Sequence, residues 1–488
     1  MKRQYSTALL LVGLVMLVAA PAWARRPNVI LIMADDLGHE CLRSYGGTSY
    51  DSRLLDEVAA RGMRFTQCYS QPVCTPSRNQ IMTGRSNARN YRAFGMLLPT
   101  EITFGNVMKD AGYKTCIAGK WQLSGDGPGT PTYKKGATPA ACGFEQSCMW
   151  AYKHDLPPGV AHSGGWEGKR GIKTSRYWHP SIVENGTYRP TTEDDYGPDI
   201  YTQFIVNFIE KNQQDEFFVY YPMALTHAPF YPTPHSADLA TADKFKNDPR
   251  YFGDMIAYTG HCVTRILDQL DKLGLAENTL VLFTTDNGSN RGVVSQQGAR
   301  VVPGGKGLPI DAGCHAPLLA VWKDTIQPGA VCHDLVEFSD FLPTIAQVCD
   351  ATLPTDRPLD GQSFLSQLKG QRGNPRAAIF MHYDKDPDAR RPSVKRIRFA
   401  FDGRHKLYLD GQMFDVANDI DEERPLDTKA LSADAQTARE RLQKGLDAMP
   451  PWEPDNSVFG NGPDNGTKSR LQELKDLRAK ASRQATVD

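Results

Sequence analysis

The run Asn28-Val-Ile-Leu-Ile-Met33, followed at once by Ala34-Asp35-Asp36, decides the fold class of this chain. A continuous apolar run of this length is typical of a strand that is buried on both faces, as in a parallel sheet covered by helices. A second run, Thr279-Leu-Val-Leu-Phe-Thr-Thr285, has the same character and is followed by Asp286-Asn287. Both runs indicate central strands of an α/β protein.

Segments with helical periodicity separate the predicted strands. Helices are expected at 52–61, 100–111 (with Thr100 as its N-cap), 198–211 and 255–273, and further strands at 217–221 and 316–322. Such alternation indicates a mostly parallel sheet. Short strands expected at 399–401 and 406–409 indicate a second sheet. The predicted fold class is α/β, with a large mixed, mostly parallel sheet sandwiched by helices and a smaller C-terminal antiparallel-sheet subdomain.

Polar side chains follow two of the predicted strands. Sites in open α/β sheets form beyond the carboxyl ends of the strands, so we expect Asp35, Asp36, Asp286 and Asn287 to meet at one edge. Taken singly, each pair also fits a helix cap or a turn, because Asp and Asn are common turn formers.

The N-terminus resembles an export signal. Two basic residues precede an uncharged apolar stretch at 8–20, and Ala22-Trp23-Ala24 supplies the small residues of a cleavage site. A membrane anchor is the alternative, but the stretch is short for a bilayer span. We expect a periplasmic or secreted protein without stable membrane association. The expected divisions are 1–24 as signal peptide, 25–374 as catalytic domain, and 375–488 as C-terminal subdomain and tail, with an exposed helix within 464–488.

Composition and charge exclude several classes of protein. Hydrophobic residues make up 40% of the 488 residues and charged residues 23%, which allows a sizeable core. Lys+Arg and Asp+Glu number 56 each, so no overall field attracts nucleic acid, and no nucleic-acid partner is expected. Ten cysteines are too few for a disulfide scaffold. Cys142 with Cys148, and Cys332 with Cys349, are possible pairs that the sequence leaves open.

The most specific motif is Cys74-Thr-Pro-Ser-Arg78, continued by Met82-Thr-Gly-Arg85. It resembles the signature C-x-P-S-R-x-x-x-[L/M]-T-G-R of the type I, formylglycine-dependent sulfatases of the alkaline-phosphatase-like superfamily. The resemblance runs from Pro27 to about Leu426. A buried structural thiol is the commoner role of cysteine in general, but the extended motif favours a catalytic role for Cys74.

The resemblance implies hydrolysis of a sulfate ester. A formylglycine-generating enzyme would convert Cys74 to 3-oxoalanine (formylglycine), and one hydroxyl of the hydrated aldehyde would attack sulfur. The other hydroxyl would then lose its proton, so that the hemiacetal expels sulfate. The resemblance also implies one Ca²⁺ ion held by oxygen ligands, which polarises the sulfate. Its expected ligands are Asp35, Asp36, Asp286, Asn287 and the converted Cys74.

Cationic residues at matching positions complete the implied site. The resemblance places Arg78 against the hydrate and the calcium ligands, and Lys120, in Gly119-Lys-Trp-Gln-Leu123, against the nucleophile and sulfate. It places His227 beside the leaving oxygen and Lys306 on the sulfate, with the general acid among these groups. The alternative for His227 and Lys306 is a core histidine and a solvated lysine.

Two positions depart from the family pattern. Gln122 stands where the family motif GKWHLG has a histidine that assists sulfate elimination. A glutamine donates and accepts hydrogen bonds but takes no proton at neutral pH. His315 stands where the family has an arginine, so the contacts of that arginine are in doubt here.

The segment between 125 and 196 is expected to form long loops over the site, where specificity commonly resides. Its aromatic and basic side chains are candidates for stacking on sugars or pairing with further anions, although packing between loops is an equal alternative. These residues are Trp150, His154, His162, Trp166, Lys169, Arg170, Arg176, Trp178 and His179.

The predicted function is hydrolysis of sulfate esters, with a sulfated glycan as the expected substrate. A phosphonate or phosphodiester hydrolase of the same fold is the second hypothesis. A non-catalytic protein that binds sulfated glycans is the third, suggested by Gln122.

Overall fold

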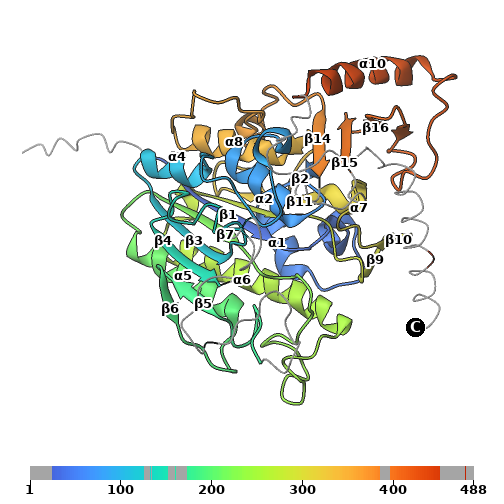
Figure 1. Cartoon of the computed structure of the whole chain (residues 1–488). Coiled ribbons are helices and arrows are strands. Elements are labelled where there is room, and N and C mark those ends of the chain that lie inside the picture. The colour runs from blue at the N-terminus through green and yellow to red at the C-terminus, as the bar shows by residue number, and fades with distance from the viewer. Residues whose placement is uncertain are drawn as a thin grey trace, which may run out of the picture.

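The computed structural model describes residues 25–125, 132, 134–151, 160, 173–384, 396–450 and 479. An 11-stranded sheet crosses the protein in the order β12-β2-β11-β8-β1-β7-β3-β4-β5-β6, with β13 also paired to β2. Figure 1 shows this sheet running through the body of the molecule. Its strands are β1 (Asn28–Ala34), β2 (Met63–Tyr69), β3 (Lys114–Lys120), β4 (Gln146–Trp150), β5 (Ile182–Glu184), β6 (Thr187–Arg189), β7 (Phe217–Pro222), β8 (Thr279–Thr285), β11 (His315–Val321), β12 (Ala330–Cys332) and β13 (Val336–Glu337).

The central strands are parallel. β1 pairs in parallel with β7 and β8, and β3 pairs in parallel with β7 and β4. Antiparallel strands flank this block, since β11 runs against both β8 and β2, and β5 runs against β4. In the β1–β8 register, Ala34 lies opposite Thr285, so the two strands end side by side.

Helices cover both faces of the sheet. Ile30 and Ile32 of β1 belong to one buried cluster, whereas Val29 and Leu31 belong to another on the opposite face. This explains why the strand sequence is apolar throughout. Figure 1 shows α4 and α8 on one side and α5 and α6 on the other. The helices are α1 (Arg53–Arg61), α2 (Cys74–Thr83), α3 (Asn87–Asn90), α4 (Phe104–Asp110), α5 (Gly197–Lys211), α6 (Phe252–Lys272), α7 (Asp311–Cys314), α8 (Phe341–Val348), α9 (Leu365–Leu368) and α10 (Ala433–Ala448).

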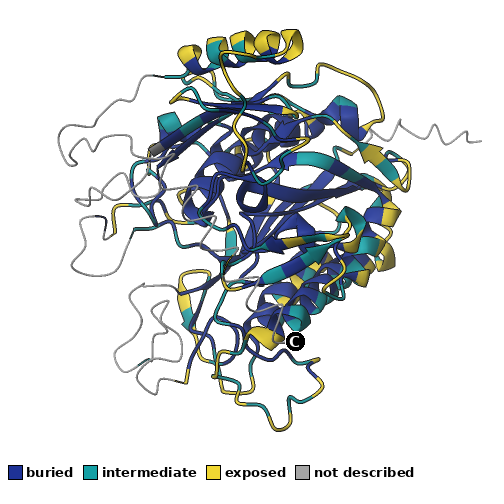
Figure 2. Ribbon diagram, turned by 90° about the vertical axis from the view of Figure 1, so that its right-hand side faces the viewer, coloured by how far each residue is buried: buried dark blue, intermediate teal, exposed yellow. Residues whose placement is uncertain are grey.

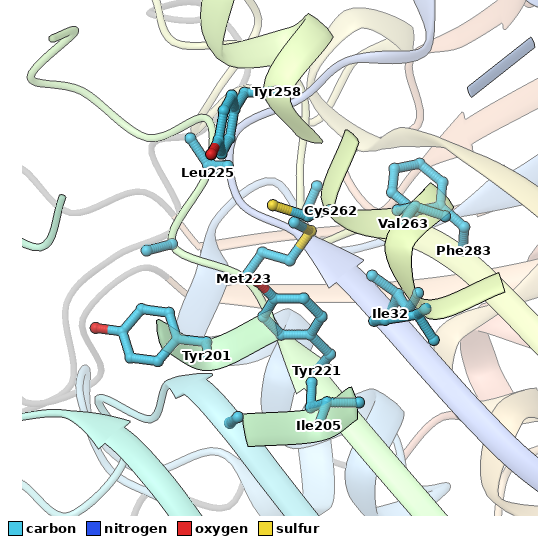
Figure 3. Packing of buried hydrophobic residues seen from close by; sticks show 14 of the residues in the cluster. Ile32, Tyr201, Ile205, Tyr221, Met223, Leu225, Tyr258, Cys262, Val263 and Phe283 are labelled. Atoms are coloured by element: carbon cyan, nitrogen blue, oxygen red, sulfur yellow. The ribbon is translucent and has the colours of Figure 1, made fainter. Parts of the chain in front are cut away.

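The packing beneath α5 and α6 is dominated by large apolar side chains. Figure 3 shows Ile32 and Tyr221 from the sheet with Ile205 of α5 and Val263 of α6. All four are completely buried. This layer fixes the central strands, whose ends carry the candidate site.

A second sheet of four antiparallel strands follows in the chain: β14 (Ile379–Asp384), β15 (Arg396–Phe401), β16 (His405–Tyr408) and β17 (Met413–Asp415). α10 covers one face of it through Leu442 and Leu446, which pack with Leu407. Figure 2 shows this helix exposed on its outer side and buried towards the sheet. A two-stranded ribbon, β9 (Val294–Gln297) with β10 (Arg300–Pro303), lies beside the large sheet.

The expected fold class is confirmed, with one correction in detail. The helix expected at 100–111 begins at Phe104, because Thr103 rather than Thr100 forms the cap, through a reciprocal capping box with Asn106. The strand expected at 316–322 is confirmed as β11; the sequence assigned it no direction, and the structure has it antiparallel to β8 and β2.

Other expectations lie partly or wholly outside the described residues. These are the signal peptide at 1–24, the helix within 464–488 and the loop residues His154, His162, Trp166, Lys169 and Arg170. The boundary between 374 and 375 stays a prediction. All ten cysteines are free, so neither possible disulfide is formed. Within the described ranges, no helix combines the length and apolar character that a membrane span requires.

Candidate active site

The predicted site residues meet at one edge of the large sheet. Asp286 and Asn287 follow β8, Asp35 and Asp36 follow β1, and Lys120 is the last residue of β3. Because β8, β1, β7 and β3 are consecutive parallel neighbours, their carboxyl ends deliver these side chains to a common position.

The motif cysteine opens α2. Cys74 is the first residue of this helix and retains 4% of its surface exposed. Arg78 is one turn further along, on the same face of the helix. Its guanidinium donates to Asp286 Oδ2 from Nη2 (2.8 Å) and Nε (3.2 Å), and from Nη1 to the Lys120 carbonyl (3.2 Å). The signature therefore ties the cysteine-bearing helix to the ends of β8 and β3.

Two lysines, one buried and one partly exposed, neutralise the two aspartates after β1. Lys120 Nζ donates to Asp35 Oδ2 at 2.6 Å, and Lys306 Nζ donates to Asp36 Oδ2 at 2.7 Å. Although burial opposes ionisation, Lys120 and His227 hold the pKa of Asp35 well below its usual range. Lys306 does the same for the pKa of Asp36. Both carboxylates are therefore charged at neutral pH.

The acidic and amide groups also contact one another. Asn287 Nδ2 donates to Asp36 Oδ1 (2.8 Å), and the Asp36 backbone N–H donates to Asp286 Oδ1 (3.2 Å). Burial, followed by the charge of Asp35, raises the pKa of Asp286 despite its contact with Arg78. This crowding of carboxylates is what a bound cation would relieve.

The oxygens in this cluster fit a hard divalent cation. Asp35 Oδ1 and Asn287 Oδ1 are buried and have no hydrogen-bond partner among the described residues. Buried polar atoms left unsatisfied in this way are costly, so two of them facing one cluster indicate a ligand. Carboxylate and amide oxygens are the ligands that Ca²⁺ prefers. Asp35, Asp36 and His227 also offer ligand atoms within 4.8 Å of one another.

His227 lies beside this cluster after β7. Its Nε2 is 3.7 Å from Asp36 Oδ2, and its Nδ1 is 2.5 Å from the Ala228 carbonyl, which can only accept a hydrogen bond. Nδ1 therefore carries a proton. Burial, helped by Lys306, lowers the pKa of His227 to about 3, so the ring is neutral at neutral pH. The side chain keeps 22% of its surface exposed, and that of Lys306 keeps 18%.

Gln122 follows β3 with an unusual backbone conformation. Its φ is 54°, in the left-handed region that few side chains adopt. Its Oε1 is buried without a hydrogen-bond partner among the described residues. An acceptor held in this way, two residues after Lys120, is available to a hydroxyl group of the nucleophile or substrate.

The structure adds a cation whose position the sequence did not indicate. Arg176 was predicted only as one of several loop residues, but its Nη1 lies 3.9 Å from Asp35 Oδ2. Its guanidinium is 4.4 Å from the centre of the Trp150 ring, at the end of β4. No motif surrounds Arg176, so only the folded path of the loop reveals this contact. Trp178 instead packs against Tyr196, and His179 Nδ1 contacts the Lys173 carbonyl.

Comparisons with known proteins show the family to which the chain belongs. The family model described as Sulfatase matches residues 27–351. Arylsulfatase A of Homo sapiens is 33% identical over 418 residues, covering 81% of this chain and 77% of that protein. N-acetylgalactosamine-6-sulfatase of Mus musculus is 30% identical over 390 residues, covering 74% and 70%. The crystal structure of Ps i-CgsB in complex with k-i-k-neocarrahexaose superposes with a TM-score of 0.69 at 21% identity, covering 94% of this chain and 99% of that one.

The fold and the converging site define a hydrolase of the alkaline-phosphatase-like superfamily. Within it, the chain belongs to the sulfatase family. It is a sulfuric ester hydrolase.

Proposed function

We propose that this enzyme hydrolyses sulfate esters of a sulfated carbohydrate, using Cys74 in its formylglycine form and one Ca²⁺ ion. The observation that carries the proposal is the meeting of Cys74, carboxylate and amide oxygens and cationic side chains at the carboxyl ends of the central parallel strands. A sulfate ester is surrounded by negative oxygens, so a nucleophile reaches its sulfur only where positive charge has been arranged beforehand.

Asp35, Asp36, Asp286, Asn287 and the converted Cys74 are the proposed calcium ligands. When bound, the ion would polarise the sulfate and lower the pKa of the hydrated nucleophile. The unsatisfied oxygens of Asp35 and Asn287 support this assignment. Arg78 also supports the assignment. Its hydrogen bond to Asp286 Oδ2 holds that carboxylate in position before a cation binds.

The remaining residues orient the ester and move protons. Lys120 pairs with Asp35 and Lys306 pairs with Asp36, and in this proposal both lysines hold sulfate oxygens in position. His227 is neutral, with its proton on Nδ1, so its Nε2 accepts a hydrogen bond until an anionic substrate favours protonation of the ring. Protonated in that way, it can donate to the leaving oxygen. Gln122 positions a hydroxyl through Oε1 but cannot act as a base.

A carbohydrate is the proposed source of the ester. The names of the mouse relative and of the Ps i-CgsB complex support this choice, since they refer to an amino-sugar sulfatase and an oligosaccharide. Arg176, stacked on Trp150 at the site, adds a cation suited to a further sulfate or carboxylate. We also propose that the protein is exported and that a formylglycine-generating enzyme matures it.

The test combines maturation and turnover. The chain is produced with and without a formylglycine-generating enzyme, and the peptide that contains Cys74 is weighed by mass spectrometry. Conversion lowers its mass by about 18 Da, because a carbonyl oxygen replaces the thiol. Sulfate release is then measured with a sulfated oligosaccharide and 4-nitrophenyl sulfate, alongside 4-nitrophenyl phosphate and a phosphonate ester.

Converted enzyme should release sulfate, whereas Cys74→Ala should lose activity by at least about 10⁴-fold, the scale of removing a catalytic nucleophile. Preferential cleavage of the phosphate or phosphonate ester would overturn the assignment. Activity retained by Cys74→Ala would remove the formylglycine mechanism.

A further inference from the structure

A second group of metal-ligating side chains lies at the same edge of the sheet. His39 belongs to the 3-10 helix η1 (His39–Cys41), Asp311 opens α7, and His315 begins β11. They retain only 3%, 6% and 8% of their surface exposed. Each offers a ligand atom, and these atoms lie within 4.8 Å of one another. None belongs to the site described above.

The hydrogen bond made by His39 determines which nitrogen is available. His39 Nδ1 lies 3.2 Å from the His315 carbonyl, which can only accept, so Nδ1 carries the proton. The lone pair is therefore on Nε2, which is 3.6 Å from Asp311 Oδ2. Metal-binding histidines typically donate their second ring N–H to a backbone carbonyl or carboxylate, and His39 has this arrangement.

Asp311 and His315 each keep one buried polar atom without a hydrogen-bond partner in the described part of the chain. His315 Nδ1 and Asp311 Oδ1 form a hydrogen bond of 2.9 Å. Asp311 Oδ2 and His315 Nε2 are buried and have no hydrogen-bond partner within the described ranges. The 3.6 Å between His39 Nε2 and Asp311 Oδ2 is close to the separation of about 3.3 Å between two ligands of a tetrahedral ion with bonds of about 2 Å.

The charges around the cluster are compatible with a cation. Arg300 Nη1 lies 3.7 Å from Asp311 Oδ2, but Arg300 also pairs with Asp421 at 2.5 Å. The buried carboxylate of Glu40 lies 3.7 Å from His39 Nδ1 on the other side of the ring. Asp421 thus offsets the charge of Arg300 beside Asp311, whereas burial raises the pKa of Glu40.

The protonation states suit metal binding as well. Burial lowers the pKa of His39 to about 3, so its ring is neutral. For Asp311, the neighbouring His315 and His39 outweigh the effect of burial and hold the carboxyl pKa below its usual range. A neutral imidazole and an ionised carboxylate are the forms that coordinate a metal.

We infer that His39, Asp311 and His315 bind a divalent transition-metal ion of the Zn²⁺ class, at a site separate from the proposed calcium site. Two imidazoles and one carboxylate suit Zn²⁺, whereas the all-oxygen cluster of Asp35 and its neighbours suits Ca²⁺. The ion would join η1, which follows Asp35-Asp36, to α7, which follows Lys306. It would therefore brace two segments that carry active-site residues.

The test is metal content rather than activity. Mature protein without an affinity tag is stripped with a chelator, loaded with Zn²⁺ or Co²⁺ in the presence of Ca²⁺, and passed through a desalting column. Wild type should retain about one equivalent of zinc per chain, and its cobalt form should show the visible absorption of a low-symmetry, nitrogen-containing site. His39→Asn and His315→Asn should each weaken zinc retention by at least about 10-fold.

Two controls separate this site from others. His333→Asn removes an exposed histidine and should retain zinc as wild type does. Asp286→Asn, in the proposed calcium site, should lower calcium content and leave zinc content unchanged. The inference would be overturned if the wild type retained no zinc, or if both His39→Asn and His315→Asn retained zinc as the wild type does. The three residues would then form a histidine–aspartate network stabilised by Arg300. If the histidine variants do not fold, the cobalt spectrum of the wild type decides alone.

Discussion

Lys120 Nζ lies 2.6 Å from Asp35 Oδ2, and both side chains are fully buried. The two residues end β3 and follow β1, which are separated in the sheet by β7. A buried ion pair gives little net stability, because desolvation offsets the attraction. Moreover, Asp35 Oδ1 has no hydrogen-bond partner in the described part of the chain. We therefore interpret the Lys120–Asp35 pair as part of a binding site and not as a contact that stabilises the fold.

We predict that Asp286→Asn weakens calcium binding at least about 10-fold, because one anionic ligand is lost where several oxygens must act together. The substitution preserves size and one oxygen, so the packing around Arg78 is largely retained. Calcium affinity is measured by isothermal titration calorimetry on chelator-treated protein. Sulfatase activity should fall in parallel and recover partly at high calcium concentration.

The matched control is Asp110→Asn at the exposed end of α4, which removes one carboxylate far from the cluster in sequence. This control should bind calcium like wild type. Equal affinities for Asp286→Asn and wild type would remove Asp286 from the ligand set.

Gln122 offers a gain-of-function prediction. Gln122→His returns the family residue to a position whose left-handed backbone tolerates histidine better than most side chains. If elimination of sulfate limits turnover, a base at this position should raise kcat, with a typical contribution of general-base catalysis being about 10²-fold.

The matched variant is Gln122→Asn, which keeps an amide, supplies no base and should not raise kcat. The expected signature is a new acid limb in the pH profile of kcat for Gln122→His. A lower kcat in Gln122→His with an unchanged pH profile would mean that this site performs elimination with another base.

The central strands could be predicted from sequence because their composition reflects burial on both faces. The run that forms β1 alternates between two clusters, and every residue in it is apolar apart from Asn28. The direction of β11 could not be predicted in this way. Its apolar sequence is the same for a parallel or an antiparallel neighbour, and only the path of the chain before it decides.

The start of α4 is hard to predict because two threonines, Thr100 and Thr103, precede the helix and either could cap it. Thr103 is the cap because its side chain and that of Asn106 each bond the backbone N–H of the other residue. The usual capping box has Glu or Gln at the position of Asn106, so the sequence does not reveal this one.

Some residues of the candidate site could likewise be predicted from sequence, and others could not. Asp35 and Asp286 follow predicted strands, so the pattern of the chain predicts that they meet, and the resemblance of the Cys74 and Lys120 motifs to the sulfatase family adds Arg78 and Lys120. Arg176 reaches Asp35 from a segment without periodicity, where local sequence does not determine the path of the chain. His39 and His315 are far apart in sequence, and only the pairing of β11 beside β8 brings them to 4.0 Å between ring centres.

Stability should fall as the pH is lowered below about 6.5. An unfolded histidine has a pKa of about 6.5, whereas burial lowers the pKa of folded His39 to about 3. Between these values the unfolded chain binds the extra proton, so stability rises with pH and is lost as the pH falls through this window. At pH 5 the loss from His39 alone is about 2 kcal/mol.

This prediction is checked by urea unfolding of chelator-treated protein at pH 7 and pH 5. His39→Asn should show a shallower loss of stability than wild type, and His333→Asn should match wild type. Equal slopes for wild type and His39→Asn would show that His39 is not held neutral in the folded state.

Arg176 should contribute to substrate binding. Its guanidinium is held over Trp150, and its Nη1 lies 3.9 Å from Asp35 Oδ2; a planar, bidentate donor suits a sulfate or carboxylate group. Arg176→Met keeps much of the side-chain volume and removes the charge, and it should raise KM for a sulfated oligosaccharide about 10-fold or more. Arg176→Lys should recover only part of this loss, because lysine lacks the planar fork.

The comparison substrate is 4-nitrophenyl sulfate, which has no further anionic group. If Arg176 recognises a second anion of the glycan, KM for the aryl ester should change much less. The control is Arg189→Met, which removes an exposed arginine paired with Glu184. If Arg176→Met instead lowers kcat equally for both substrates with KM unchanged, Arg176 acts on the reacting sulfate in the transition state rather than on the glycan.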